Sequence, residues 1–367
     1  MIKDRGQKKL AARHCAVQGM VPFVEVVVRS SVSMEEAPLN ITDIDVLGVE
    51  IGPFGRVRRV LFDCKTAKGQ SAINRALWAS GLRHLVEAEM GFLIQTKSVP
   101  GTHRLAASAM GINIQTEDTF RRYAASMSPD FLKDSTYLDD MDHWDLLLAA
   151  GGSNAALSEI VAFVTTQAAL EQPGPKGIRA GLSALMRAAG ELDPGKPLHH
   201  VIFGCAVSGF LIHAAASVAA LKDVFDFGMS RAEFEQRLRY FLWEGRENYE
   251  VRQKLRRALY EKFGSGSEQA NGDFDLPEWG KLLELMRGYL EAPEALGTLP
   301  LVAKEIAFRA DAGEPKSDAD KRISDLLVSN NRARQFIFAA SSYLVQAARL
   351  PRDFHKSLEL SVNFMHR

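Results

Sequence analysis

Short apolar runs and amphipathic segments alternate along the first 120 residues. Runs rich in β-branched residues, typical of strands, occupy 21–30, 41–52, 56–66, 91–99 and 113–117. Segments with apolar residues at helical spacing occupy 4–20, 68–90 and 101–112. The predicted order is therefore helix, three strands, helix, strand, helix, strand, which is typical of a mixed α/β fold.

Beyond Phe120 the strand pattern fades, and apolar residues recur at helical spacing through most of the remaining chain. Links rich in Pro, Gly and Ser, such as 171–177 and 263–277, separate the predicted helices. We predict an α/β domain at 1–122 and a large all-α region at 123–367, with a subdivision near residue 265 as one arrangement. Each domain is expected to have its own core, so a charge buried in the second would leave the first folded.

The segment from Val201 to Leu221 contains 21 residues and no Asp, Glu, Lys or Arg. That length is sufficient to span a bilayer. However, the segment is rich in Ala, Gly and Ser, and His213 near its middle would be costly in lipid. We therefore predict a buried central helix of the all-α region, with a membrane-spanning helix as the alternative.

Composition narrows the class of protein. Of 367 residues, 46% are hydrophobic and 25% are charged, with 45 basic and 45 acidic side chains, as in ordinary soluble globular proteins. Residues 1–125 hold 17 Lys and Arg against 12 Asp and Glu, an excess of +5. The three cysteines have no C-x-x-C spacing, so neither a disulfide framework nor a zinc site is expected. No apolar segment follows the charged N-terminal residues, so we expect no signal peptide and predict a cytoplasmic location.

One predicted strand ends in opposite charges. In RRVLFDCKT, residues 58–66, an apolar run is followed directly by Asp63, Cys64 and Lys65. Aspartate and lysine are poor strand formers and costly to bury. Because Asp63 and Lys65 are two residues apart on a strand, they project from the same face. Either they form an ordinary exposed ion pair, or the two charges have a function at this strand end.

The preceding residues predict how this strand is paired. The sequence IG-PFG-RV is typical of a hairpin with a three-residue loop at 53–55, whose glycine takes the left-handed conformation. Residues that face each other across the hairpin then have numbers that sum to 108. This register places Asp45 opposite Asp63, and Asp43 opposite Lys65.

Two facing carboxylates destabilise a sheet unless something neutralises them. A divalent cation does so, and carboxylate oxygens suit Mg²⁺ or Mn²⁺, which also bind phosphate oxygens. Lys65 beside such a cation can orient an attacking water and stabilise the negative charge that develops on phosphorus. This combination of groups is suited to hydrolysing a phosphodiester, and the basic excess of the first 125 residues permits a polyanionic substrate.

These residues resemble the PD-(D/E)xK nuclease superfamily, which has the restriction-endonuclease-like fold. The motif is Asp45 in TDIDVLGVEIG together with Asp63-Cys64-Lys65 in VLFDCKT, and the order of predicted elements over about the first 120 residues is also similar. The resemblance implies that the side chains of Asp45 and Asp63 and the carbonyl of Cys64 bind Mg²⁺ or Mn²⁺. It also implies that Lys65 serves the attacking water.

Four further residues are candidates for substrate binding. Many members of the superfamily carry a Glu on the first helix, where this chain has Gln7; Glu25 on the first strand is an alternative source of that carboxylate. Lys68, Gln70 and Arg75 open the following helix and are placed to contact backbone phosphates. Ordinary surface positions are the alternative for these three residues.

The sequence therefore predicts a metal-dependent endonuclease, with DNA as the first expectation for its substrate and RNA as the alternative. By analogy with the superfamily, whose nuclease domains are often joined to unrelated modules, the expected role is that of an effector in a bacterial restriction or anti-phage system. We expect the helical region to bind a protein partner or to mediate self-association, and we do not expect membrane binding. The alternative is a catalytically weak or inactive protein of the same fold that binds nucleic acid or a partner complex.

Overall fold

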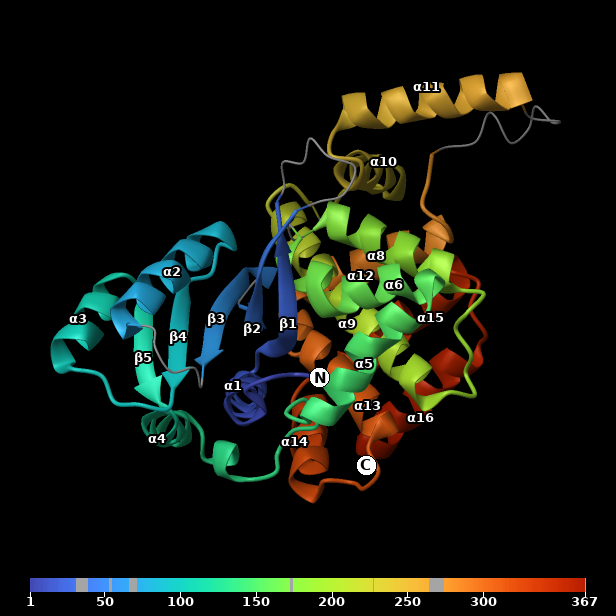
Figure 1. Cartoon of the computed structure of the whole chain (residues 1–367). Coiled ribbons are helices and arrows are strands. Elements are labelled where there is room, and N and C mark those ends of the chain that lie inside the picture. The colour runs from blue at the N-terminus through green and yellow to red at the C-terminus, as the bar shows by residue number, and fades with distance from the viewer. Residues whose placement is uncertain are drawn as a thin grey trace.

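The structure is a computed structural model that describes residues 1–30, 39–52, 55–65, 71–171, 174–226, 228–263 and 274–366. A five-stranded mixed sheet in the N-terminal part stands beside a large helical region (Figure 1). The predicted order of the first eight elements, and the helical character of the rest, are confirmed. Among the described residues, no strand follows Thr116.

The strands lie in the sheet in the same order as in the chain. The first three pair antiparallel, whereas β4 and β5 pair parallel to β3 and to each other. Their bounds are β1 (Val21–Arg29), β2 (Asn40–Ile51), β3 (Val57–Lys65), β4 (Met90–Gln95) and β5 (Ile112–Thr116). The central strand β3 is therefore the one that carries the Asp63-Cys64-Lys65 motif.

The predicted register of the β2–β3 hairpin is confirmed. Leu47 faces Leu61 and Ile51 faces Val57, so the facing numbers sum to 108. Gly55 has φ of 78°, a left-handed conformation that favours glycine. Pro53, the predicted first residue of the turn, lies outside the described residues.

Two pairs of helices cover the sheet. One face packs against α1 (Arg5–Val17) and α4 (Glu117–Met127), where rings from both helices surround Phe62 and Phe92. The other face, at β4 and β5, packs small alanines of α2 (Ala72–Leu85) and α3 (Gly101–Ala109) against Leu93, Ile112 and Ile114. This alternation follows from the two-residue period of β4, which directs Phe92 and Leu93 to opposite faces.

The helical region surrounds one long apolar helix. It comprises η2 (Pro129–Leu132), α5 (Met141–Ser153), α6 (Ala155–Ala162), the π-helical turn η3 (Phe163–Gln167), α7 (Ala168–Leu170), α8 (Pro175–Ala188), α9 (Pro197–Leu221), α10 (Arg231–Leu242), α11 (Arg246–Phe263), α12 (Trp279–Glu291), η4 (Pro293–Leu296), α13 (Leu299–Asp311), α14 (Ser317–Val328), α15 (Ala333–Ala347) and α16 (Asp353–Met365). Within the described residues, α9 is the one helix long and apolar enough to cross a membrane, and 94% of its most apolar window is buried inside the protein. The prediction of a buried central helix is therefore confirmed.

The main hydrophobic core runs without a break from the sheet into the helical region, and a smaller cluster lies apart from it between the sheet and α2 and α3. The shared main core differs from the expectation that each part has a core of its own. At the tip of the β2–β3 hairpin, a Cβ on Gly55 would lie 2.1 Å from the carbonyl oxygen of Ala215 in α9, so the two backbones are in close contact. Lys304 of α13 is buried beneath β1, where its Nζ donates to the Pro22 carbonyl at 2.9 Å. Burial lowers the pKa of Lys304 to about 8.

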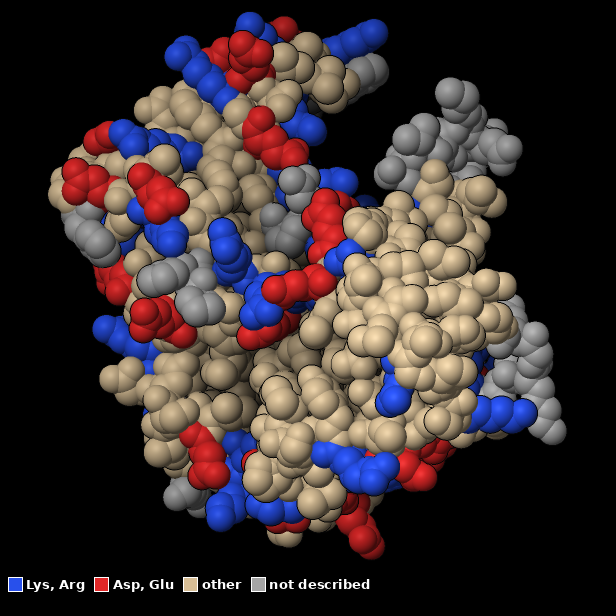
Figure 2. Space-filling model, turned by 90° about the vertical axis from the view of Figure 1, so that its left-hand side faces the viewer, with Lys and Arg blue, Asp and Glu red and all other residues tan. Residues whose placement is uncertain are grey.

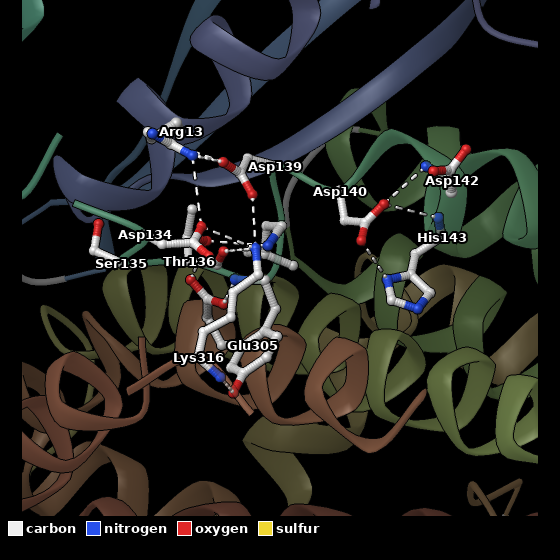
Figure 3. A network of polar contacts seen from close by, with 12 residues as sticks. Arg13, Asp134, Ser135, Thr136, Asp139, Asp140, Asp142, His143, Glu305 and Lys316 are labelled. Atoms are coloured by element: carbon white, nitrogen blue, oxygen red, sulfur yellow. Dashed lines mark hydrogen bonds and ion pairs between the residues drawn. The ribbon is translucent and has the colours of Figure 1, made fainter. Parts of the chain in front are cut away.

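A polar network joins the two parts on the side of α1 (Figure 3). Buried Asp139 accepts a hydrogen bond of 2.7 Å from Nε of Arg13 on α1, and lies 3.2 Å from Nζ of Lys316 beyond α13. Buried Glu305 of α13 accepts from the backbone N–H of Tyr137 at 2.9 Å. The domain boundary expected after residue 122 falls inside α4. The polar network binds the segment that follows α4 to α1 on one side and to α13 on the other. The subdivision considered near 265 lies outside the described residues.

Candidate active site

The sheet divides at the end of β3. The last paired residues of β2 and β3 are Val46 and Phe62. Beyond them β2 continues to pair with β1, and β3 continues to pair with β4. The backbone N–H of Cys64 donates to Oδ2 of Asp45 at 2.7 Å, so a carboxylate takes the place of a strand carbonyl at this split.

Three acidic residues occupy the next row across the split. The registers place Glu25 of β1, Asp45 of β2 and Asp63 of β3 directly after the row Val24–Val46–Phe62. We call these three residues the carboxylate row. Glu25 has φ of 55° and is not paired with β2, although its neighbours Val24 and Val26 both are. Asp45 and Asp63 are 4% and 3% exposed, so the row is largely removed from water.

Two cations from helices neutralise most of this charge. Lys8 of α1 forms ion pairs with Glu25 and with Oδ1 of Asp45, the latter at 2.8 Å. Arg75 of α2 donates two hydrogen bonds to Asp63, with its Nε 2.6 Å from Oδ2. Three carboxylates against two cations leave one negative charge in the group.

Burial changes the acid–base behaviour of these groups. Burial, together with repulsion from Asp45, raises the pKa of Asp63 and of Glu25 despite the opposing effects of Arg75 and Lys8. Burial alone would lower the pKa of Lys8, but the charges of Asp45 and Glu25 outweigh it, so the pKa of Lys8 is raised. Lys8 is therefore a permanent cation in this site and is not suited to accept a proton.

The remaining predicted residues lie close to the split. Lys65 is half-buried at the end of β3, and its carbonyl accepts from Nε2 of Gln7 at 3.3 Å. Gln7 is 1% exposed and also donates to Glu117 of α4 at 3.0 Å, so this side chain positions the end of β3 rather than facing solvent. The Cys64 thiol is fully buried, and burial raises its pKa well above the ordinary value. Cys64 therefore takes part in the site through its backbone, whose N–H binds Asp45.

A cleft of about 640 Å³ opens at the split. Its walls come from both parts of the molecule, because α5 contributes Asp145, Leu148 and Ala149 opposite the strand ends. We call this cavity the site cleft. Its lining includes five carboxylates against three lysines, namely Asp4, Glu25, Asp43, Asp45 and Asp145 against Lys3, Lys8 and Lys65. Asp43 and Lys65 both line the site cleft. These are the two residues that would face each other if the β2–β3 register continued beyond its last pair.

No family model, curated protein or solved structure matches this chain. The carboxylate row supplies hard oxygen donors, and the excess of acid in the site cleft favours a cation, so the residues fit Mg²⁺ or Mn²⁺ by charge and donor type. As arranged, the described residues hold no cluster of three or more His, Cys, Asp or Glu side chains positioned to bind a metal. Lys8 contacts Asp45, and Arg75 contacts Asp63. A divalent cation would have to replace one of these contacts.

Sequence and structure differ in how the carboxylates are neutralised. Lys8 was not among the predicted site residues, although it precedes Ala11, Ala12 and Cys15 on the buried face of α1, and a lysine on such a face is a detectable signal. For Arg75 the sequence suggested either a phosphate contact or an ordinary surface position. In the structure its guanidinium forms an ion pair with Asp63. Lys68 and Gln70 lie outside the described residues.

Replacing Lys8 with methionine should destabilise the metal-free protein by roughly 3–5 kcal/mol, because buried Asp45 and half-buried Glu25 would lose the cation that they share. Millimolar Mg²⁺ should restore much of this loss if the freed oxygens bind it. Thermal unfolding with and without Mg²⁺ measures both effects, and Lys9→Met, at an exposed position next to Lys8, is the matched control. A Lys8→Met protein as stable as the wild type without metal would contradict the assigned ion pairs.

Proposed function

We propose that this protein is a metal-dependent nuclease of the restriction-endonuclease-like, PD-(D/E)xK type, which hydrolyses phosphodiester bonds in DNA rather than RNA. The observation that supports the proposal is that Asp45, Asp63 and Lys65 come together at a split in the sheet, where Asp45 and Lys65 line the site cleft and Asp63 lies behind them, paired with Arg75. These three residues come from two strands whose pairing was predicted from the hairpin loop alone. A solvated strand end does not account for carboxylates that are 3–4% exposed.

Under this proposal the carboxylates of Asp45 and Asp63, with the carbonyl of Cys64, would hold Mg²⁺ or Mn²⁺. When bound, the ion supplies positive charge that acidifies a water and stabilises the phosphorane-like transition state. Lys65 orients the attacking water and stabilises charge from the neighbouring position on β3. Lys8, held protonated by two carboxylates, adds fixed positive charge at the same edge. Gln7 positions the Lys65 backbone.

A second candidate function is nucleic-acid or partner binding without hydrolysis. The observation that favours it is the pairing of Asp45 with Lys8 and of Asp63 with Arg75, since both carboxylates already have a cation. In either case we place the protein in bacterial restriction or anti-phage defence in the cytoplasm, with the helical region binding a protein partner or a second copy. That context rests on analogy with nuclease domains joined to other modules.

The two candidates are separated by cleavage assays on plasmid, single-stranded DNA and RNA with Mg²⁺, Mn²⁺, Ca²⁺ or excess chelator. Wild-type protein should cleave with Mg²⁺ or Mn²⁺, and Lys65→Ala should lower the rate by roughly 10²–10³-fold without unfolding the protein. Lys97→Ala, an exposed lysine shortly after β4, is the matched control and should keep the wild-type rate. Full activity after chelation, or an unchanged rate in Lys65→Ala, would overturn the nuclease proposal.

A further inference from the structure

A second cavity of about 460 Å³ adjoins the site cleft. The two share Glu25 of β1 and Leu148 of α5 in their linings, so they meet at the end of the carboxylate row. From there the second cavity follows the outer half of β1, which is the edge strand of the sheet. Its other wall is made by α5, α6 and η3, so a bound molecule would again lie between the sheet and the helical region.

The lining of the second cavity combines three kinds of surface. Apolar side chains such as Val161 and Leu170 offer contact area, and hydroxyl and amide groups of Ser158, Thr166 and Gln167 offer hydrogen bonds. Two basic and two acidic residues complete the lining, Arg29 and Lys176 with Glu25 and Glu171. Lys176 is paired with Glu171 at 2.9 Å, so Arg29 supplies the positive charge at the far end of the cavity. Arg29 is four residues beyond Glu25, which on a strand corresponds to about 13 Å from the carboxylate row. This sequence of surfaces suits a molecule with apolar rings, hydrogen-bonding groups along its length and a negative charge within reach of Arg29.

Two irregular backbone features lie along the same path. Glu25, where the cavities meet, is a non-glycine residue in the left-handed region. The facing turn η3 is π-helical, and its Thr166 hydroxyl accepts from the Val27 N–H at 3.3 Å. Left-handed non-glycine residues and π-helical turns are both common at functional sites. These two backbone features and the shared lining residues indicate that the two cavities form one groove.

Burial limits what can reach the carboxylate row. Asp45 and Asp63 are 4% and 3% exposed, and α5 stands opposite the strand ends. The two adjoining cavities measure about 640 and 460 Å³ and are enclosed between the sheet and the helical region, so one strand fits between these walls and two paired strands do not. On the face at the α2–α3 end of the molecule, Lys and Arg side chains lie interspersed with Asp and Glu and form no continuous basic surface (Figure 2).

We infer that the site cleft and the second cavity form one groove that binds a single nucleic-acid strand, with a phosphate at the carboxylate row and the adjoining nucleotides along β1 towards Arg29. This inference rests on the proposed function, since it names the class of nucleic acid that the same site accepts. A duplex is a substrate only where its strands separate.

Binding and cleavage are measured separately to test the groove. Fluorescence anisotropy with a labelled oligonucleotide of about 12 nucleotides, in Ca²⁺, compares the single strand with a blunt hairpin duplex of the same sequence. We expect the single strand to bind at least about tenfold more tightly. Ala162→Trp fills the second cavity and should weaken single-strand binding at least about fivefold, whereas Ala155→Trp, at an exposed position of the same helix α6, should not. Melting curves verify that both variants are folded.

A second variant keeps the test decisive if Ala162→Trp does not fold. Arg29→Ala should weaken single-strand binding and reduce the slope of log K against log salt by about 0.7, the value for one phosphate contact on a single strand. Tight single-strand binding that depends on Ala162 or Arg29, but without cleavage in any metal, would support the groove and refute the nuclease. Equal or tighter binding of the duplex, or single-strand binding unchanged by the folded variants, would overturn the groove even if cleavage is observed.

Discussion

Replacing Asp63 with alanine should abolish metal-dependent cleavage, with a loss of at least about a thousandfold, which corresponds to about 4 kcal/mol in the activation barrier. The same change should lower the stability of the metal-free protein by roughly 3 kcal/mol, because Arg75 would lose the carboxylate that accepts both of its hydrogen bonds. Two facing carboxylates alone would predict the opposite effect on stability, since removing one would relieve repulsion. The ion pairs found at the split reverse that expectation.

Initial rates on a single-stranded substrate and thermal unfolding in chelator measure the two effects of Asp63→Ala. Asp63→Asn is the informative companion, because it keeps the shape and a partial acceptor for Arg75 while removing the charge. It should therefore lose cleavage but retain more stability. Glu314→Ala, which removes an exposed carboxylate from a loop far along the chain, should leave both quantities unchanged. Contaminant-free cleavage by Asp63→Ala at a rate near that of wild type would end the assignment.

Replacing Ala215 with arginine should unfold the sheet and the helices together. Ala215 is fully buried in α9, and its carbonyl lies against the backbone of Gly55 at the β2–β3 hairpin. Burying an unpaired guanidinium there should cost roughly 4–5 kcal/mol or more, a large part of the stability of an ordinary domain. Because the core is continuous, the loss should not stop at the boundary of the helical region.

Hydrogen exchange resolved to peptides distinguishes the two outcomes for Ala215→Arg. Amides of β3 and β4 and amides of α13 should lose protection to the same extent. Ala220→Arg, at an exposed position of the same helix, is the matched control and should keep native protection. Protection retained in the strands but lost in the helices would mean that the sheet folds independently, as its sequence alone suggests.

The local features of the fold were predictable because neighbouring residues determine them. The three-residue loop at 53–55 gave the hairpin register, and from that register followed the adjacency of Asp45 and Asp63. The amphipathic and apolar patterns likewise indicated each strand and the buried course of α9. In each case the signal lies within about ten to twenty residues of chain.

The features that were missed depend on contacts between distant segments. The pairing of Lys8 with Glu25 and Asp45 joins residues from α1, β1 and β2. It could not be predicted from the hairpin loop, because that loop does not determine the position of α1. The wall that α5 adds to the site cleft comes from about 80 residues beyond β3. The hydrogen bond from Lys304 to the Pro22 carbonyl is a further example, since no residue near Pro22 in the sequence indicates it. A lysine on an otherwise apolar helix face is the one such signal that the sequence offered.

The position of β1 at the edge of the sheet has a consequence for anyone who shortens this chain. Its outer side is covered by η3, which supplies the hydroxyl that binds the Val27 N–H. A fragment that ends after α4 would expose a valine-rich strand edge with unpaired backbone donors and acceptors, a surface that recruits other strands. Such a fragment should aggregate even though it contains every strand of the sheet. The helical region therefore acts, within one chain, as the solubilising cover of the sheet.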